Sequence, residues 1–287
     1  MDRTEVRKPD EEILRVARHA LTEDIGRGDA TSLSTVPEDA LARGRFLAKE
    51  SLVVSGLEAA RAVFFASDER VRFEAFAEEG DRVEAGAVIA AIEGNARSIL
   101  AAERVALNLL MRLSGVATLT NKYVEAISGT GASITDTRKT TPGLRVLEKA
   151  AVRAGGGTNH RSGLDDGILI KDNHLAIAGG VSEAVRRAKE NSPHLLKVEV
   201  EVENMDELEE AFEAKADAVL LDNVSPEEVG RCVDAAREKA PGMLVEISGG
   251  VNLGTVRAYA ESGPDLISVG ALTHSALAAD VSLEIEA

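Results

Sequence analysis

The sequence has no tryptophan, a single cysteine and few aromatic residues, and these shortages narrow the class of protein. Cys232 is the only cysteine among 287 residues, which excludes a framework of intrachain disulfides. Aromatic residues make up 3% of the chain and hydrophobic residues 44%, so the core must be built from Val, Leu, Ile and Ala. An aliphatic core of this kind favours an α/β protein, with two domains or one large barrel at this length.

Long hydrophobic runs are also missing. No window approaches the roughly 20 apolar residues that a membrane-spanning helix needs. The start of the chain lacks the apolar segment of a signal peptide. We therefore predict a cytoplasmic protein.

Basic residues are scarce relative to acidic ones. Lys and Arg number 33 and Asp and Glu 49, which gives a net charge of −16 and argues against nucleic-acid or membrane-surface binding. Such an acidic surface is compatible with a high-salt cytoplasm and equally with an ordinary soluble protein.

The first part of the chain predicts a small domain over residues 1–115. Residues 10–22 have helical spacing behind an Asp10 cap, and residues 42–93 contain short strand-like runs between turns. One run resembles a lipoyl- or biotinyl-carrier hairpin, but no lysine lies between Lys49 and Lys122 to carry the cofactor. A long helix is expected over 96–128, interrupted near Gly115, and we expect a C-terminal helix to pack back on this domain.

From about residue 133, aliphatic strands alternate with helical stretches, which predicts a second domain over 116–287. The strands are expected at 132–137, 167–171, 195–202, 217–222, 243–248 and 265–270. Six strands are too few for a complete eight-stranded barrel. We predict an incomplete, open α/β barrel of about six parallel strands, with a doubly wound open sheet as the alternative.

Polar residues follow these strands where each one ends. They are Thr137, Arg138 and Lys139, then Lys171, Glu201, Asp222, Ser248 with Gly249 and Gly250, and Gly270. Because the carboxyl ends of barrel strands converge on one face, we expect these residues to share a site. Cationic groups, two carboxylates and a Gly-Gly loop together suit a polyanion and a metal ion.

Positive charge is concentrated in residues 134–174. This segment contains seven basic and five acidic residues in a chain that is strongly acidic overall. Such a local excess attracts anionic substrates that the rest of the surface repels. A triple glycine, 155–157, precedes Asn159, His160 and Arg161 and permits close approach to a ligand, although such runs are more often flexible loops.

Two glycine-rich turns and one arginine complete the candidates. The turns at 248–254 and 268–276 join strands to helices, a position where backbone N–H groups bind phosphate. Arg104 lies on an apolar stripe with Leu100, Leu107 and Met111. It is either a structural arginine or one presented across a subunit interface.

Long stretches of the chain resemble the quinolinate phosphoribosyltransferases, or decarboxylating nicotinate-nucleotide pyrophosphorylases. The stretches lie in collinear order at 21–32, 103–118, 135–174, 197–204, 220–223, 246–252 and 267–275. The resemblance implies an N-terminal α/β sandwich and an incomplete α/β barrel. It also implies a homodimer, or a hexamer built as a trimer of dimers, in which Arg104 reaches the neighbouring site.

The resemblance also implies roles for individual residues. The quinolinate set comprises Arg104, Arg138, Lys139, His160 and Arg161. Thr137 belongs to the predicted substrate-binding residues without a more specific role. The set for phosphoribosyl pyrophosphate and Mg²⁺ comprises Lys139, Lys171, Glu201, Asp222, Ser248, Gly249, Gly250, Val269, Gly270, Ala271 and His274. Glu201 and Asp222 are the metal ligands in this scheme, with Glu201 preferred over Glu199 and Glu203, which lie on the same strand face.

The implied reaction produces nicotinate mononucleotide, pyrophosphate and CO₂ in de novo NAD biosynthesis. Lys139, Lys171, Glu201 and Asp222 are the predicted catalytic residues, and the division of roles between the two lysines stays open. One alternative is a related transferase with another substrate, such as the molybdenum-operon homologue. Another is a non-catalytic phosphate-binding regulator, which would not need paired Glu201 and Asp222.

Overall fold

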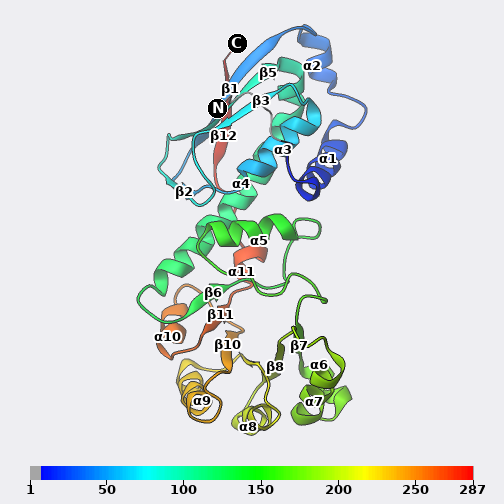
Figure 1. Ribbon diagram of the computed structural model, residues 1–287. Helices are drawn as coiled ribbons and strands as arrows, with labels where there is room; N and C mark the ends of the chain where they lie inside the picture. The colour runs from blue at the N-terminus through cyan, green and yellow to red at the C-terminus, as the bar shows by residue number, and fades with distance from the viewer. Residues whose placement is uncertain (1–7, 287) are drawn as a thin grey trace, which may run out of the picture. The chain divides into compact units, whose positions relative to one another are not determined.

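The structure is a computed structural model that describes residues 8–286. The chain divides into two compact units, labelled by element in Figure 1. The first comprises the chain up to Asn121, Thr140–Gly156 and the segment from Ser275 onward. The second comprises Lys122–Lys139 and Gly157–His274. None of the helices among the described residues is long and apolar enough to cross a membrane.

The first unit is built on a four-stranded antiparallel sheet with the order β12-β1-β5-β3. Its strands are β1 (Leu41–Ala48), β3 (Arg72–Ala75), β5 (Val88–Asn95) and β12 (Val281–Glu286), with a separate pair β2 (Leu52–Val53) and β4 (Arg82–Val83). Its helices are α1 (Glu11–Ile25), α2 (Ala30–Thr35), α3 (Leu57–Ser67), α5 (Arg145–Ala154) and α4 (Ala96–Ala126), which begins in this unit. Alternate residues of β1 are buried, and the rings of Phe46, Phe64 and Phe73 pack with centroids 5.8–6.2 Å apart.

The expected first helix is confirmed as α1, and Asp10 caps it by accepting a hydrogen bond from the N–H of Glu12 at 2.8 Å. The expected interruption near Gly115 is wrong, because α4 is continuous. A Cβ on Gly115 would lie 2.0 Å from the carbonyl oxygen of Leu277, so this glycine permits a close backbone approach.

Two further expectations for this part of the chain need correction. The strand-like region 42–93 also contains a helix, α3, whose buried face includes Val63 and Phe64. The C-terminal segment returns as the strand β12 and not as a helix, since it pairs antiparallel with β1 from Arg43 to Ala48. Alternation at period two in residues 281–286 fits a strand at the edge of the sheet.

The second unit is a six-stranded parallel sheet with the order β6-β11-β10-β9-β8-β7. The strands are β6 (Ser133–Thr135), β7 (Ile168–Ile170), β8 (Val198–Val202), β9 (Ala218–Asp222), β10 (Leu244–Ser248) and β11 (Leu266–Ser268). All six lie within the predicted ranges. From β7 to β11 each strand pairs with the next, and β6 pairs with the last, which is the succession of a barrel left open between β6 and β7. The doubly wound alternative is therefore wrong, because the sheet has no switch in strand order.

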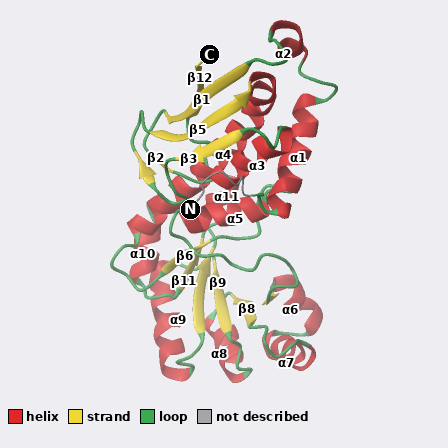
Figure 2. Cartoon of the chain, turned by 45° about the horizontal axis from the view of Figure 1, so that its top comes forward, coloured by secondary structure: helices red, strands yellow, loops and turns green. Residues whose placement is uncertain are grey.

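The helices of this unit follow its strands. They are α6 (Asp172–Ala178), α7 (Val181–Asn191), α8 (Met205–Glu213), α9 (Pro226–Lys239), α10 (Val256–Glu261) and α11 (Ala271–His274). Helices α7 and α8 pack against β8, and helix α9 packs against β10. Figure 2 shows these three helices beside the strands of the sheet. Along β8 the valines are fully buried, whereas Glu199 and Glu201 on the opposite face are half-buried. The barrel interior thus carries polar side chains.

Candidate active site

The carboxyl ends of the six strands bring the predicted barrel residues together in the second unit. These are Thr137, Arg138, Lys139, His160, Arg161, Lys171, Glu201, Asp222, Ser248, Gly249, Gly250, Val269, Gly270, Ala271 and His274. Arg104 lies exposed on α4 in the first unit. We call the carboxyl end of the sheet the barrel mouth.

The ends of the first and last strands meet at Lys139. Its carbonyl accepts a hydrogen bond from the hydroxyl of Thr273 at 2.9 Å, and its N–H donates to Oγ1 of Thr137 at 3.1 Å. A Cβ on Gly270 would lie 3.1 Å from Cδ of Lys139 and 3.2 Å from Nε2 of His274. Glycine at this position therefore leaves room for the lysine stem and the imidazole to lie side by side, with the lysine exposed.

Two arginines lie near the opening between β6 and β7. Nη1 of Arg161 donates to the carbonyl of Gly167 at 2.8 Å, which orients the guanidinium. Burial, followed by the nearby charge of Arg138, lowers the pKa of Arg161. An arginine still keeps its charge at neutral pH, so the pair concentrates positive charge that an anion would neutralise.

Lys171 directly follows the second strand, β7, and its side chain reaches a residue of the third, β8. Its Nζ lies 3.1 Å from Oε2 of Glu201, and its backbone N–H donates to Nδ1 of His174 at 3.0 Å. His174 occupies the first turn of α6, so it holds the backbone from which Lys171 projects. The ion pair places one cation and one carboxylate side by side at the mouth.

Asp222 and the Ser248–Gly250 turn end the neighbouring strands β9 and β10. Nδ2 of Asn223 donates to Oδ2 of Asp222 at 2.6 Å, and the N–H of Asn223 donates to the carbonyl of Ser248 at 3.0 Å. Gly249 and Gly250 have φ angles of +88° and +64°, which favour glycine. A Cβ on Gly249 would lie 2.3 Å from Oδ1 of Asn223. The turn is therefore packed tightly against the end of β9.

Below the mouth lies a group of four side chains that we call the deep cluster: His160, Glu199, Glu246 and Ser268. Nε2 of His160 lies 3.2 Å from Oε2 of Glu199 and 3.6 Å from Oε1 of Glu246. The hydroxyl of Ser268 donates to Oε1 of Glu246. Burial, and then the charge of Glu199, raise the pKa of Glu246 to about 7.

A buried carboxylate holds the loop that carries His160. Oδ1 of Asp136 accepts the backbone N–H of His160 at 2.9 Å, and Oδ2 accepts from Nδ2 of Asn159 at 2.6 Å. The ring of His160 makes a further contact, since its Nδ1 accepts the N–H of Arg161 at 2.7 Å. Both ring nitrogens therefore have partners within the protein.

Two sets of residues have donor atoms suited to a metal ion. In the deep cluster, one donor atom each from His160, Glu199 and Glu246 lies within 4.8 Å of the others. A nitrogen donor in a buried setting favours a transition metal, whereas Mg²⁺ prefers carboxylates, water and substrate phosphates. The half-buried carboxylates of Glu201 and Asp222, on neighbouring strands at the open mouth, fit Mg²⁺ better.

The three candidate glutamates of β8 and its end separate clearly. Glu199 belongs to the deep cluster, and Glu201 pairs with Lys171 at the mouth. Glu203 lies beyond the strand and is exposed, with its N–H donating to Oε2 of Glu207 at 2.9 Å. Although period-two spacing places all three on one face, their heights along the barrel differ.

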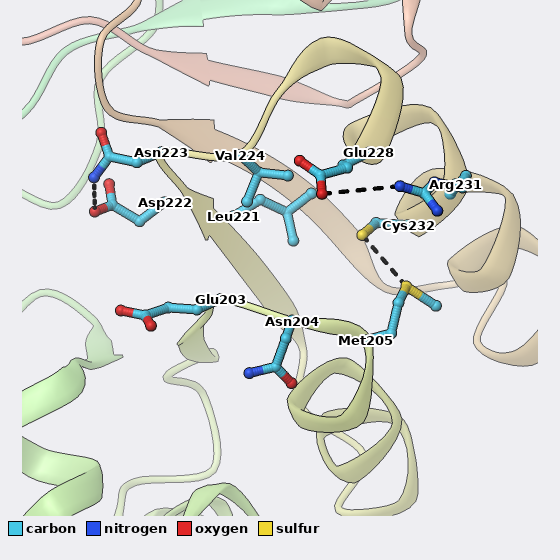
Figure 3. A pocket seen from close by; sticks show the side chains of 10 residues that line it. All are labelled: Glu203, Asn204, Met205, Leu221, Asp222, Asn223, Val224, Glu228, Arg231 and Cys232. Atoms are coloured by element: carbon cyan, nitrogen blue, oxygen red, sulfur yellow. Dashed lines mark hydrogen bonds and ion pairs between the residues drawn. The ribbon is translucent and has the colours of Figure 1, made fainter.

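A cavity of about 550 Å³ opens beside Asp222 between the ends of β8 and β9 (Figure 3). Its lining residues are Glu203, Asn204, Met205, Leu221, Asp222, Asn223, Val224, Glu228, Arg231 and Cys232. Sγ of Cys232 lies 3.6 Å from Sδ of Met205, and burial raises the pKa of this thiol. The thiol is therefore a packing group in the cavity wall and a poor nucleophile.

The sequence prediction missed Asp136, His174, Glu246 and Ser268. For Glu246 and Ser268 a signal was present, because each lies two residues before a predicted mouth residue, Ser248 or Gly270. Period two along a strand places such residues on the same interior face, one layer lower. Charged or polar residues in otherwise apolar strands were the sign of a polar barrel interior.

Comparison with known proteins identifies the family. The sequence-family model of the quinolinate phosphoribosyl transferase C-terminal domain matches residues 116–284. The family model of the N-terminal domain matches residues 29–114. A Synechocystis protein named as a probable nicotinate-nucleotide pyrophosphorylase (carboxylating) is 43% identical over 265 residues, covering 92% of this chain and 90% of its own. The Mycobacterium leprae nicotinate-nucleotide pyrophosphorylase (carboxylating) is 41% identical over 273 residues, covering 93% and 95%.

Solved structures agree. The nicotinate-nucleotide pyrophosphorylase from Francisella tularensis superposes with a TM-score of 0.90 at 41% identity and covers 98% of each chain. The resemblance and the predicted fold class are therefore confirmed.

Proposed function

The chain belongs to the quinolinate phosphoribosyl transferase family, and we propose that its barrel mouth converts quinolinate and phosphoribosyl pyrophosphate into nicotinate mononucleotide. Pyrophosphate and CO₂ are the other products, and the step belongs to de novo NAD biosynthesis. One observation carries the assignment to the mouth. Arg138, Arg161 and Lys171 gather there, in a protein of net charge −16, beside two carboxylates and a Gly-Gly turn.

Quinolinate carries two adjacent carboxylates. The guanidinium groups of Arg138 and Arg161 present planar forks that match carboxylate geometry, and their mutual repulsion favours an anion between them. Lys139 and His274 lie close to each other at Gly270. Like the two arginines, they belong to the predicted substrate-binding residues.

Phosphoribosyl pyrophosphate needs groups for its phosphates and for its ribose. The Ser248–Gly250 turn offers backbone N–H groups in a tight conformation with two left-handed glycines. Helix α10 has only six residues, so we assign phosphate binding mainly to the turn itself. Glu201 and Asp222 would hold Mg²⁺, which supplies counter-charge for the pyrophosphate when bound.

In the proposed reaction the pyridine nitrogen attacks the anomeric carbon of the ribose while the bond to pyrophosphate breaks. The protein contributes mainly orientation and electrostatic stabilisation of an oxocarbenium-like transition state. The ring carbon 2 then loses its carboxylate as CO₂, the pyridinium charge stabilises the resulting carbanion, and a proton replaces the carboxylate. Lys139 and Lys171 orient the reacting groups.

We also propose that the protein is a cytoplasmic homodimer, or a hexamer of such dimers, in which Arg104 completes the partner's site. The exposed position of Arg104 on α4 supports this role. A mixed dimer of Arg104→Ala and Arg138→Ala chains would hold one site with both arginines intact. Mixing the two impaired variants should therefore raise the activity above that of either variant alone, and a strictly intramolecular site would give no such gain.

A turnover assay tests the proposal directly. Purified protein with Mg²⁺ and phosphoribosyl pyrophosphate should release CO₂ from carboxyl-labelled quinolinate and should not use nicotinate in its place. Arg138→Ala should reduce kcat/KM for quinolinate by about 10–100-fold, as expected for the loss of a hydrogen bond to a charged group. No CO₂ release from the wild-type protein would refute the proposed function, and release without Mg²⁺ would refute the metal site.

A further inference from the structure

The deep cluster holds charged groups that the proposed reaction does not use. Glu199 comes from β8, Glu246 from β10 and Ser268 from β11, so three strands contribute to it. The side chain of Glu246 is only 2% exposed. Burying two carboxylates costs free energy unless they are well partnered, so their presence calls for a role.

The contacts of His160 define the state of its ring. A backbone N–H, that of Arg161, points at Nδ1 from 2.7 Å, so Nδ1 is an acceptor and carries no proton. Nε2 faces the oxygens of Glu199 and Glu246 and is therefore the protonated nitrogen. The arrangement selects the neutral Nε2–H tautomer.

The surroundings of the ring contain opposing charges. The hydrogen bond to Glu199, and more weakly the charge of Glu246, raise the pKa of His160, while burial and Arg161 oppose that rise. A second ring proton would break the bond from the Arg161 N–H and place two hydrogens against each other. Because that N–H belongs to the backbone and cannot rotate away, we favour the neutral ring.

His160 in turn acts on its neighbour in the chain. The Nδ1 contact fixes the backbone of Arg161, and the bond to Gly167 fixes the far end of the same side chain. Asp136 holds the backbone N–H of His160 from below, at the end of β6. The chain of contacts thus runs from the barrel interior to a guanidinium at the mouth.

We propose that Glu246, with Glu199 and Ser268, is a positioning residue: it fixes the ring of His160, which holds Arg161 in the orientation that binds a quinolinate carboxylate. This assignment rests on the proposed function, because it takes Arg161 as a quinolinate ligand. Glu246 acts through His160 and not by touching the substrate. The raised pKa of Glu246 agrees with a neutral partner in a buried hydrogen-bonded group.

Two variants of nearly equal volume test the hydrogen bonds. Glu246→Leu removes both oxygens and should raise KM for quinolinate about tenfold, while KM for phosphoribosyl pyrophosphate stays within about twofold. Glu246→Gln keeps an acceptor and a donor and should stay close to the wild type in both. Equal KM values for quinolinate in the wild type and the Leu variant would overturn the proposal, and so would a Gln variant as impaired as the Leu variant.

The ring can also be observed without any substrate, by ¹⁵N NMR of protein labelled at its five histidines. His160→Asn assigns the signal by its loss and keeps an acceptor near the position of Nδ1. At pH 8 we expect a bare Nδ1 and a protonated Nε2 in the wild type and in Glu246→Gln, and a mixture of tautomers in Glu246→Leu. A protonated Nδ1 in the wild type would overturn the assignment even if quinolinate turnover is normal. If the protein does not turn over quinolinate but the tautomer is as expected, the proposed substrate is wrong, whereas the hydrogen bonds assigned to the deep cluster remain valid.

Discussion

Two glutamates, one in each unit, are almost fully buried but have opposite surroundings. In the first unit, Glu148 on α5 accepts from Nε and Nη2 of Arg112 at 3.1 and 2.8 Å, and from the N–H and hydroxyl of Thr141 at 2.9 and 2.7 Å. In the second unit, Glu246 has the hydroxyl of Ser268 and lies beside a second carboxylate. Similar burial therefore accompanies four donor contacts in one case and like-charge repulsion in the other.

The difference separates a structural carboxylate from one whose ionisation is adjustable. The hydrogen bonds to Glu148 tie α4, α5 and the loop at Thr141 together within the first unit. The surroundings of Glu246 disfavour its charge and raise its pKa to about 7. Protein interiors can thus use the same residue as an anchor or as a titrating group, depending on the partners that the fold provides.

Removal of the anchor should have the largest effect. We expect Glu148→Ala to lower the free energy of unfolding by about 3–5 kcal/mol, because it leaves the Arg112 charge without its buried partner. Denaturant unfolding followed by circular dichroism measures this. A loss below about 1 kcal/mol is typical of an exposed ion pair, and it would show that Glu148 is not a structural carboxylate in contrast to Glu246.

The second-largest effect should be the pH dependence of folding stability that Glu246 causes and that distinguishes it from Glu148. Its pKa is about 7 in the folded protein against 4.5 as the ordinary value, so between these pH values the folded state retains a proton that the unfolded state has lost. This contribution to stability is complete below about pH 4.5 and is lost as pH rises through 7. The free energy of unfolding of Glu246→Gln relative to that of the wild type should therefore rise by on the order of 2–3 kcal/mol when the pH is raised from 5 to 8. Comparing the stability of the two proteins at each pH cancels the contributions of the other titrating groups. A stability difference that does not change with pH would contradict the raised pKa of Glu246.

A smaller effect is expected from the hydroxyl that serves Glu246. Ser268→Ala should cost about 1–2 kcal/mol at pH 8, since an ionised buried carboxylate loses a donor. At pH 5, where Glu246 is mostly protonated, the cost should be lower. Thermal unfolding of the variant and the wild type at both pH values tests this, and a cost independent of pH would indicate lost packing instead.

The smallest effect should come from a partly exposed glutamate at the protein surface that has good partners. Glu183 on α7 pairs with Arg186 at 2.7 Å and Arg187 at 2.6 Å, and these contacts, Arg186 first, lower its pKa to about 2. Solvent screens such pairs, so Glu183→Gln should leave the unfolding midpoint unchanged. This variant is the surface control for both buried sites, and a clear loss of stability would show that burial is not what separates them.

Much of the barrel could be read from the chain because its signals are local. Aliphatic runs such as 217–222, with turn residues between them, predicted all six parallel strands, and polar residues at their ends predicted the mouth. The errors arose where a distant segment decides the outcome. Gly115 resembled a helix break, yet the close approach of Leu277, more than 150 positions later, accounts for it.

The sequence alone determined the aliphatic α/β character, the order of the strands along the chain and the collection of cations and carboxylates that marks the family. Spacing could not separate Glu199, Glu201 and Glu203, because alternation along a strand defines a face and not a height in the barrel. Only the tertiary structure decided that Glu246 and Ser268 lie with Glu199 around His160. Those contacts join strands that are distant in sequence, and the strength of each depends on burial, which exists only once the sheet has curled.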